Sequence, residues 1–202
     1  MTVLINLFGS SSAGKSSLMA DLFQTLKFKG YTVEMCPEII KQWAWDGIYP
    51  NKYDQYFLMG QEIKQQSRLL GKVDFAISDS PVLQNSFYNW YLNKADNLFQ
   101  PSKDYLDMVI ADGHTVVNYM LFRNKPFETK GRYQSEEESD MIASALLSYL
   151  TERGFSVPKL PGQDHERVEA ILKNLLPSAS ASDAEDSPHF LDNIYYLLKG
   201  RH

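Results

Sequence analysis

A glycine-rich segment near the start of the chain is the feature that most constrains how this sequence can fold. Residues 9–16 read GSSSAGKS and match the pattern G-x-x-x-x-G-K-[ST] at every fixed position. An apolar run at residues 3–8 (VLINLF) precedes it and is typical of a buried strand in a parallel sheet. Residues 15–29 follow it and carry leucines at helical spacing. A strand, this loop and a helix, in that order, form the context in which the pattern binds phosphate.

The residue types of this segment suit a polyphosphate. Gly9 and Gly14 allow the backbone to curl so that successive N–H groups point inward, and the following helix adds the positive end of its dipole. Lys15 is expected to reach the β- and γ-phosphates of ATP, and the Ser16 hydroxyl to bind Mg²⁺. A Ser/Gly turn without function is the alternative, which the flanking strand and helix disfavour. The expected phosphate-binding residues are Gly9, Ser10, Ser11, Ser12, Ala13, Gly14, Lys15, Ser16 and Ser17.

Strand and helix patterns alternate along the rest of the chain. Further strands are expected at residues 32–36, 73–78, 115–122 and 155–157. Helices are expected to begin at Pro37 and to cover residues 53–70, 84–97, 102–111, 136–152 and 165–176. This alternation predicts a doubly wound α/β fold, in which helices cover both faces of a parallel sheet.

The 202 residues are expected to form one domain with a short appendage. Residues 1–176 carry the alternating pattern and make up the domain. Residues 177–188 (PSASASDAEDSP) are rich in Ser, Ala and acidic residues, which is typical of a linker. Residues 189–202 begin with an apolar stretch and are predicted to dock on the domain or on a partner.

Charge and cysteine content limit the environment and the partners. The chain has 20 Lys and Arg against 25 Asp and Glu, and this net charge of −5 disfavours a main affinity for nucleic-acid backbones. A single cysteine, Cys36, excludes an internal disulfide, and the four His lack metal-ligand spacing. No transmembrane run or signal peptide is visible. The sequence therefore predicts a cytoplasmic protein that does not contact a membrane.

Two carboxylates follow strands that should end at the phosphate-binding edge of the sheet. Asp79 follows the strand at 73–78 and is expected to assist Mg²⁺, although an Asx turn before Pro81 is the alternative. Glu38 follows the strand at 32–36. It is either a general base that accepts a proton from an acceptor hydroxyl or an acid in the first turn of a helix, and its spacing does not decide between the two.

A basic segment follows the fourth expected strand. Residues 123–132 contain Arg123, Lys125, Lys130 and Arg132 against a single acid, Glu128. A mobile basic loop is what a phosphoryl-transfer lid requires, because it excludes water and places arginine near the developing charge. We expect a lid at about residues 123–135. The alternative is a solvated loop whose charge is balanced by the acids that begin the next helix.

Aromatic residues gather in two groups that each follow a strand end. The first group lies at residues 43–57 and the second at residues 87–91. Most of these residues are expected to pack in the core, with one or two lining a pocket for a nucleobase. Within the first group, residues 51–54 (NKYD) match the N-K-x-D guanine motif, but they lack its preceding strand. We interpret this match as coincidence, with Asn51 or a neighbour capping a helix.

The order of these motifs resembles a known superfamily. A P-loop, then Cys36-Pro37-Glu38 with a tryptophan at position 43, then Ser78-Asp79-Ser80 and a basic lid are similar to deoxynucleoside and thymidylate kinases. The segments SDSP (78–81) and GRYQSEEE (131–138) look more closely like those of small phage-encoded P-loop kinases. That group includes nucleotide kinases and kinases that act on 5-hydroxymethyl-deoxyuridine in DNA.

The resemblance covers about residues 1–155 and has structural and chemical implications. It implies a P-loop NTPase three-layer sandwich whose five-stranded parallel sheet has the order 2-3-1-4-5. It also implies that Glu38 is the base and that Arg123 and Arg132 are lid arginines. The chain departs from the deoxynucleoside and thymidylate kinases at Ser80, where those enzymes usually carry arginine.

Together these features predict a kinase that uses ATP and Mg²⁺ to phosphorylate a nucleoside, a nucleotide or a modified pyrimidine. The expected catalytic residues are Lys15, Glu38, Asp79, Arg123 and Arg132, with Ser16 and Asp79 at the metal. Two alternatives stay open: a 5-hydroxymethyl-deoxyuridine DNA kinase, and an ATPase switch that docks a partner through residues 189–202. The prediction allows a homodimer, and for a phage-encoded chain the compartment would be the host cytoplasm.

Overall fold

The computed structural model describes residues 1–176, so the expected linker and docking segment lie outside the described residues. The strands are β1 (Val3–Phe8), β2 (Val33–Cys36), β3 (Phe75–Ser78), β4 (Thr115–Leu121) and β5 (Lys159–Leu160). The helices are α1 (Lys15–Phe28), α2 (Ile40–Trp45), α3 (Asp54–Ser67), α4 (Val82–Asn93), α5 (Phe99–Ala111), α6 (Glu136–Glu152) and α7 (Asp164–Leu175).

The five strands form one parallel sheet in the order β2-β3-β1-β4-β5. In the central strand, Ile5 pairs with Ile77 of β3 and with Val117 of β4. Every residue of β1 is buried, which explains its continuous apolar sequence. The predicted P-loop NTPase sandwich with sheet order 2-3-1-4-5 is confirmed. Because parallel strands end at one edge, the loops that follow β1, β2 and β3 meet there.

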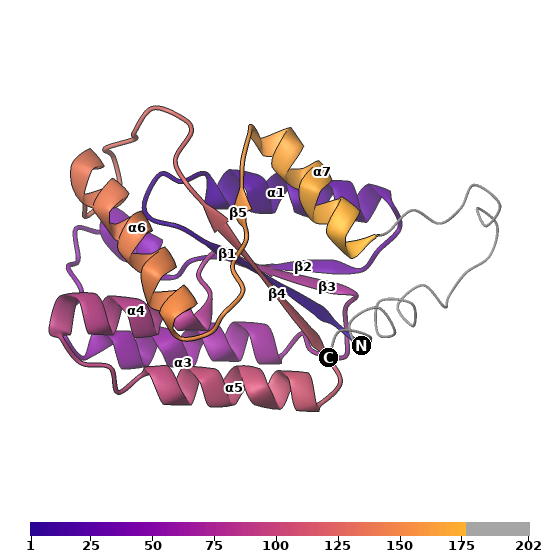
Figure 1. Ribbon diagram of the computed structural model, residues 1–202, viewed down its shortest axis with the longest axis horizontal. Helices are drawn as coiled ribbons and strands as arrows, with labels where there is room; N and C mark the ends of the chain where they lie inside the picture. Colours follow the sequence, from indigo (N-terminus) through magenta and orange to yellow (C-terminus); the bar gives the residue numbers. More distant parts are fainter. Residues whose placement is uncertain (177–202) are drawn as a thin grey trace.

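Helices cover both faces of the sheet, so the molecule has three layers (Figure 1). Helices α1 and α7 pack on one face, where Leu22 of α1 and Ile171 of α7 are fully buried. Helices α4, α5 and α6 contribute to the core on the other face, where Phe87 and Leu146 are fully buried. α3 packs beside α4 on this second side. The packed layers hold the loops at the carboxyl edge of the sheet in fixed positions.

The expected strand at residues 155–157 is wrong in position, because the last strand is Lys159–Leu160. Phe155 and Val157 supply apolar side chains to the core next to α6 instead. Pairing with β4 begins only at Pro158, whose carbonyl accepts a hydrogen bond from the Met120 N–H at 2.9 Å. The apolar pattern at 155–157 therefore reflects burial rather than strand pairing.

The helix expected to begin at Pro37 begins later, at Ile40. The backbone N–H of Glu38 donates to Asp79 Oδ1 at 2.7 Å, and this bond holds the chain after β2 against the end of β3. Other boundaries also differ from the prediction, most clearly those between α4 and α5. Helix α4 ends at Asn93, before Lys94 in the left-handed region, and α5 begins at Phe99.

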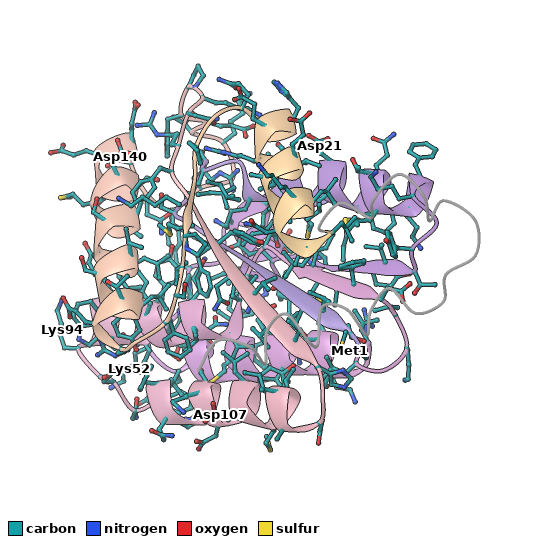
Figure 2. All side chains as sticks on the ribbon, turned by 45° about the vertical axis from the view of Figure 1, so that its right-hand side comes forward. Met1, Asp21, Lys52, Lys94, Asp107 and Asp140 are labelled. Carbon is teal, nitrogen blue, oxygen red and sulfur yellow. The ribbon has the colours of Figure 1, made fainter. Side chains whose placement is uncertain are left out.

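Charged side chains lie around the outside of the molecule. The labelled Asp21, Lys52, Lys94, Asp107 and Asp140 are exposed, while apolar side chains fill the space between sheet and helices (Figure 2). Among residues 1–176, none of the helices has both the length and the apolar character needed to cross a membrane.

Candidate functional site

The loop after β1 has the backbone conformation expected of a phosphate-binding loop. Gly9 has φ +156°, and a Cβ at this position would lie 2.8 Å from the carbonyl oxygen of Leu121. Gly14 is left-handed, with φ +89°, and caps the start of α1. Any residue other than glycine at position 9 would displace β4. At position 14 the left-handed backbone favours glycine. The sequence pattern therefore corresponds to a physical requirement at both glycines.

Lys15 lies within this loop and is buried. Its Nζ donates to the carbonyl oxygens of Gly9 at 2.7 Å and Ser10 at 2.9 Å. Burial lowers the pKa of Lys15, and the nearby carboxylates of Glu38 and Asp79 oppose this shift. The ammonium group thus lies at the centre of the loop, where a polyphosphate would replace the carbonyl oxygens as its partner.

Asp79 joins the phosphate loop to the end of β2. Its Oδ2 accepts a hydrogen bond from Ser16 Oγ at 2.7 Å, and its Oδ1 accepts the N–H of Glu38. A hydroxyl oxygen beside a carboxylate fits Mg²⁺, which prefers oxygen ligands and completes its shell with water and substrate phosphates. The described residues contain no cluster of three or more His, Cys, Asp or Glu that could hold a metal by itself. The arrangement therefore suits a metal that is shared with a bound phosphate.

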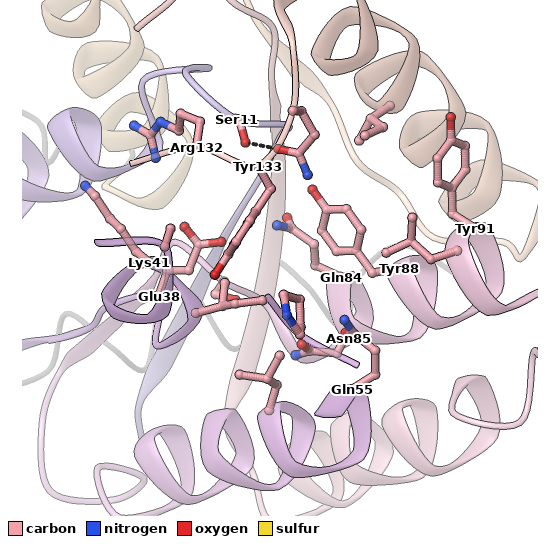
Figure 3. A pocket seen from close by; sticks show the side chains of 18 of the residues that line it. Ser11, Glu38, Lys41, Gln55, Gln84, Asn85, Tyr88, Tyr91, Arg132 and Tyr133 are labelled. Atoms are coloured by element: carbon pink, nitrogen blue, oxygen red, sulfur yellow. Dashed lines mark hydrogen bonds between the residues drawn. The ribbon is translucent and has the colours of Figure 1, made fainter. Parts of the chain in front are cut away.

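Two cavities lie side by side at the carboxyl edge of the sheet. The smaller has a volume of about 190 Å³ and is lined by residues of the P-loop and by Lys125, Pro126 and Glu128 of the lid. The larger, of about 350 Å³, lies between α2, α3, α4 and the lid (Figure 3). Glu38, Lys41 and Arg132 line both cavities. We call the first the phosphate cavity and the second the acceptor cavity.

Glu38 is half-buried where the two cavities meet. Burial raises the pKa of its carboxyl, and Asp79 adds to this effect, whereas Lys15 and Arg132 oppose it. The backbone hydrogen bond to Asp79 keeps the residue at this position. Glu38 precedes α2, which begins at Ile40, and its carboxyl faces both cavities.

The two lid arginines lie in different places. Arg132 lines both cavities, and its Nε is buried without a hydrogen-bond partner among the described residues. Arg123 lines neither cavity. Its guanidinium is 2.6 Å from both Glu136 and Asp140, at the start of α6. The structure therefore brings Arg132, but not Arg123, together with Lys15, Glu38 and Asp79.

The lid contacts both the P-loop and the loop after α2. Gln134 accepts a short hydrogen bond from Ser11 Oγ, and Tyr133 donates to the carbonyl oxygen of Ile48 at 2.6 Å. Behind the lid, Ser139 Oγ donates to the carbonyl oxygen of Ser11 at 2.7 Å. These contacts hold residues 133 and 134 against the P-loop and the loop after α2. Lys41 and Ser139 were not identified from the sequence, because neither belongs to a motif.

The expectation that most of the clustered aromatic residues lie in the core is wrong. Exposed members of the two groups are Trp45, Tyr49, Tyr53, Tyr56, Phe57 and Trp90. Trp45 ends α2, Tyr49 and Tyr53 lie between α2 and α3, and the others lie on exposed positions of α3 and α4. Sequence spacing alone does not distinguish a buried position from an exposed one there. Tyr49, Tyr88 and Tyr91 line the acceptor cavity. The expectation that one or two aromatics line a pocket therefore understates their number.

Asn51, in the segment that matches the guanine motif, lies in neither cavity. Its Oδ1 accepts the N–H of Tyr53 at 2.8 Å, and its own N–H donates to Asp54 Oδ2 at 2.6 Å. These bonds order the turn that precedes α3. The N-cap residue of α3 is Tyr53, which makes no side-chain hydrogen bond to the helix, so the expected cap by Asn51 is not observed.

Arg167 of α7 connects the P-loop to the base of the lid. It is buried and donates to the carbonyl oxygens of Ala13 at 3.3 Å and Phe122 at 2.8 Å. Ala13 belongs to the P-loop and Phe122 directly precedes the lid. Arg167 is therefore placed to fix the position of both segments relative to α7.

We expect the substitution Arg167→Met to lower the free energy of unfolding by about 2–4 kcal/mol, because it leaves buried carbonyl groups without donors. Chemical denaturation measures this loss. Lys173→Met, at an exposed position of the same helix, is the control and should change stability by less than about 0.5 kcal/mol. Equal stability of the two variants would show that Arg167 does not anchor these segments.

Comparison with known proteins identifies the fold. No family model and no curated protein matches the sequence. Similar solved structures include deoxyadenosine kinase from M. mycoides with bound dATP, with a TM-score of 0.51 and 18% identity over 85% of this chain and 98% of that chain. The structure of the same kinase with dCMP and dCDP gives a TM-score of 0.55 and 16% identity, again over 85% of this chain and 98% of that chain.

The NadR protein in complex with NR is similar as well, with a TM-score of 0.62 and 16% identity over 85% of this chain. The match covers 51% of NadR, so this chain spans about half of that protein's length. At these identities the likeness establishes the fold. The chain has the P-loop NTPase fold.

Proposed function

We propose that the protein is a kinase that transfers the γ-phosphoryl group of ATP to a small acceptor of nucleoside or nucleotide type. The observation that carries this proposal is the junction of the two cavities at Glu38, Lys41 and Arg132. A P-loop ATPase needs only a site for the nucleotide and for water. A second, larger cavity that shares a carboxylate and cations with the phosphate cavity is instead what transfer to a bound acceptor requires.

Each residue at the junction has a proposed role. The P-loop amides and Lys15 hold the β- and γ-phosphates. Glu38 accepts the proton of the acceptor hydroxyl as that oxygen bonds to the γ-phosphorus and the bond to the bridging oxygen of ADP breaks. Arg132 stabilises the charge of the transferred group. Ser16 and Asp79 would hold Mg²⁺, which neutralises phosphate charge when it is bound.

An acceptor screen with γ-labelled ATP and Mg²⁺ tests this proposal. The panel contains nucleosides, deoxynucleoside monophosphates, nicotinamide riboside, and duplex DNA with and without 5-hydroxymethyl-uracil. Label on one acceptor well above the rate of hydrolysis supports a kinase and identifies its substrate. Label released only as free phosphate would contradict the proposal and favour the ATPase switch.

We expect the substitution Arg132→Ala to lower kcat by about a hundredfold, because it removes a cation from the junction of the cavities. Arg123→Ala is the matched comparison. In the wild-type protein, Arg123 forms ion pairs with the exposed carboxylates of Glu136 and Asp140. Removing its side chain should therefore lower kcat by less than about tenfold. Steady-state kinetics with the best acceptor measures both. A larger loss for Arg123→Ala than for Arg132→Ala would reverse the proposed roles.

A further inference from the structure

The acceptor cavity contains buried polar groups that lack partners. Its lining includes Gln55, Glu62, Gln84 and Asn85, which are 4%, 1%, 2% and 6% exposed. In each of them one side-chain atom has no hydrogen-bond partner within the described chain: Gln55 Oε1, Glu62 Oε2, Gln84 Oε1 and Asn85 Nδ2. We call these side chains the polar wall. Unpaired buried polar groups are costly, so their concentration in one cavity points to a ligand that pairs with them.

The polar wall lies on α3 and α4. Its three amides lie across the cavity from the junction, whereas Glu62 lies beside Ser80 and Ile39, next to Asp79 and Glu38. In Figure 3, Gln55, Gln84 and Asn85 lie on the opposite side of the pocket from Lys41 and Arg132. A ligand long enough to reach from the polar wall to Glu38 would therefore place one end against the amides and the other at the reacting phosphate. This geometry separates the part of the acceptor that is recognised from the part that reacts.

The charges around the acceptor cavity disfavour an acceptor that carries its own phosphate. Lys41 and Arg132 line this cavity, but both also line the phosphate cavity and are available to ATP. Of the described charged residues, those that line the acceptor cavity alone are acids, Glu62 and Glu138. A phosphate monoester would need a cation of its own on this side. Ser80, a neutral residue, lies there instead.

Glu62 is the ionisable residue of the polar wall, and its burial favours the protonated, neutral form of the carboxyl. The side chain of Ser80 and the backbone of Ile39 lie beside its carboxyl and favour the charged form, but burial outweighs them. Burial raises the pKa of Glu62 to about 8, and Glu38 and Asp79 add to the shift. Around this carboxyl or along the same cavity lie Cys36, Glu38 and Lys41 from β2 and the segment after it, Asp79 after β3, Tyr88 from α4, and Arg132 from the lid. Glu62 therefore presents an O–H donor near neutral pH.

We propose that the acceptor is an uncharged molecule of nucleoside type, that it binds the polar wall through an edge bearing both hydrogen-bond donors and acceptors, and that Glu62 selects it. The inference rests on the proposed function and narrows its substrate class to hydroxyl acceptors without a phosphate. The amides of Gln55, Gln84 and Asn85 can each donate and accept, and Glu62 donates. The edge of a heterocyclic base supplies the complementary groups.

The test is the pH dependence of the acceptor KM, measured with the common deoxynucleosides and their 5′-monophosphates. The wild-type protein should phosphorylate a nucleoside in preference to its monophosphate. Its KM for that nucleoside should rise roughly tenfold as the pH passes from about 7 to about 9.5, because Glu62 loses its proton and its donor. Glu62→Gln keeps an N–H donor and does not titrate, so its KM should stay constant over this range.

Controls separate this inference from the proposed function and from misfolding. Glu169→Gln, at an exposed position of α7, should keep the wild-type pH profile. Thermal denaturation checks that each variant folds. Glu62→Leu should raise the acceptor KM about tenfold at pH 7 and should remove its rise between pH 7 and pH 9.5. A fluorescent ATP analogue measures nucleotide binding separately.

The inference is overturned if the protein prefers monophosphates, or if the KM of Glu62→Gln rises with pH as in the wild type. In either case the proposed kinase function still stands. ATP binding without transfer to any nucleoside overturns the inference as well. Absence of ATP binding in the wild-type protein removes the proposed function and this inference together.

Discussion

Replacing Lys15 by alanine should lower phosphoryl transfer by about a hundredfold to a thousandfold. The Lys15 ammonium lies at the centre of the P-loop, where it donates to the carbonyl oxygens of Gly9 and Ser10. With ATP bound, the same charge would lie against the β- and γ-phosphates and stabilise the charge that develops during transfer. The measurement is the rate of label transfer from γ-labelled ATP to the best acceptor of the screen.

The fold should survive this change. Burial lowers the pKa of Lys15, so the charged form is held at a cost in the absence of phosphate. We therefore expect the unfolding free energy of Lys15→Ala to lie within about 1 kcal/mol of the wild-type value. Lys27→Ala, at an exposed position of the same helix, is the control and should keep full activity. Full transfer activity in Lys15→Ala would contradict the assignment of the P-loop.

The sheet could be predicted because its strands carry a strong local signal. β1 is buried on both faces, so an uninterrupted apolar sequence is required there, and the glycine at its end is required by the approach of β4. β5 could not be placed in this way. It has two residues, and the apolar pattern that precedes it is explained by packing against α6.

The phosphate side of the site was predictable for a similar reason. Strand ends of a parallel sheet meet at one edge, so Glu38 and Asp79 could be placed beside the P-loop from their positions after two strands. The two lid arginines could not be told apart. Both lie in one basic segment of the sequence. Only the position of α6 shows that Arg123 forms ion pairs with Glu136 and Asp140, whereas Arg132 lines the cavities.

The polar wall was not predictable at all. Gln55 and Glu62 come from α3, and Gln84 and Asn85 come from α4. Glutamine and asparagine are common on exposed helix faces, and none of these residues belongs to a spaced motif. Only the packing of α3 against α4 brings them into one cavity and buries them.

Replacing Glu38 by glutamine should lower kcat by about a hundredfold to ten-thousandfold, because an amide cannot accept the proton of the acceptor hydroxyl. The backbone N–H of residue 38 still donates to Asp79, so the segment should keep its place. Binding of an ATP analogue should change little. A loss of kcat with retained nucleotide affinity therefore isolates proton removal from phosphate binding.

The pH profile distinguishes a base from a structural carboxylate at this position. Burial and Asp79 raise the pKa of Glu38, so its carboxylate form is lost at a higher pH than that of an exposed glutamate, whose pKa is about 4.3. The wild-type kcat should fall as the pH drops through this raised value, while the residual rate of Glu38→Gln should not. Glu137→Gln, at an exposed position of α6, should keep the wild-type fall. If Glu38→Gln kept both the rate and the acid limb, proton removal would lie elsewhere. Glu38 would then serve only through the hydrogen bond of its backbone to Asp79.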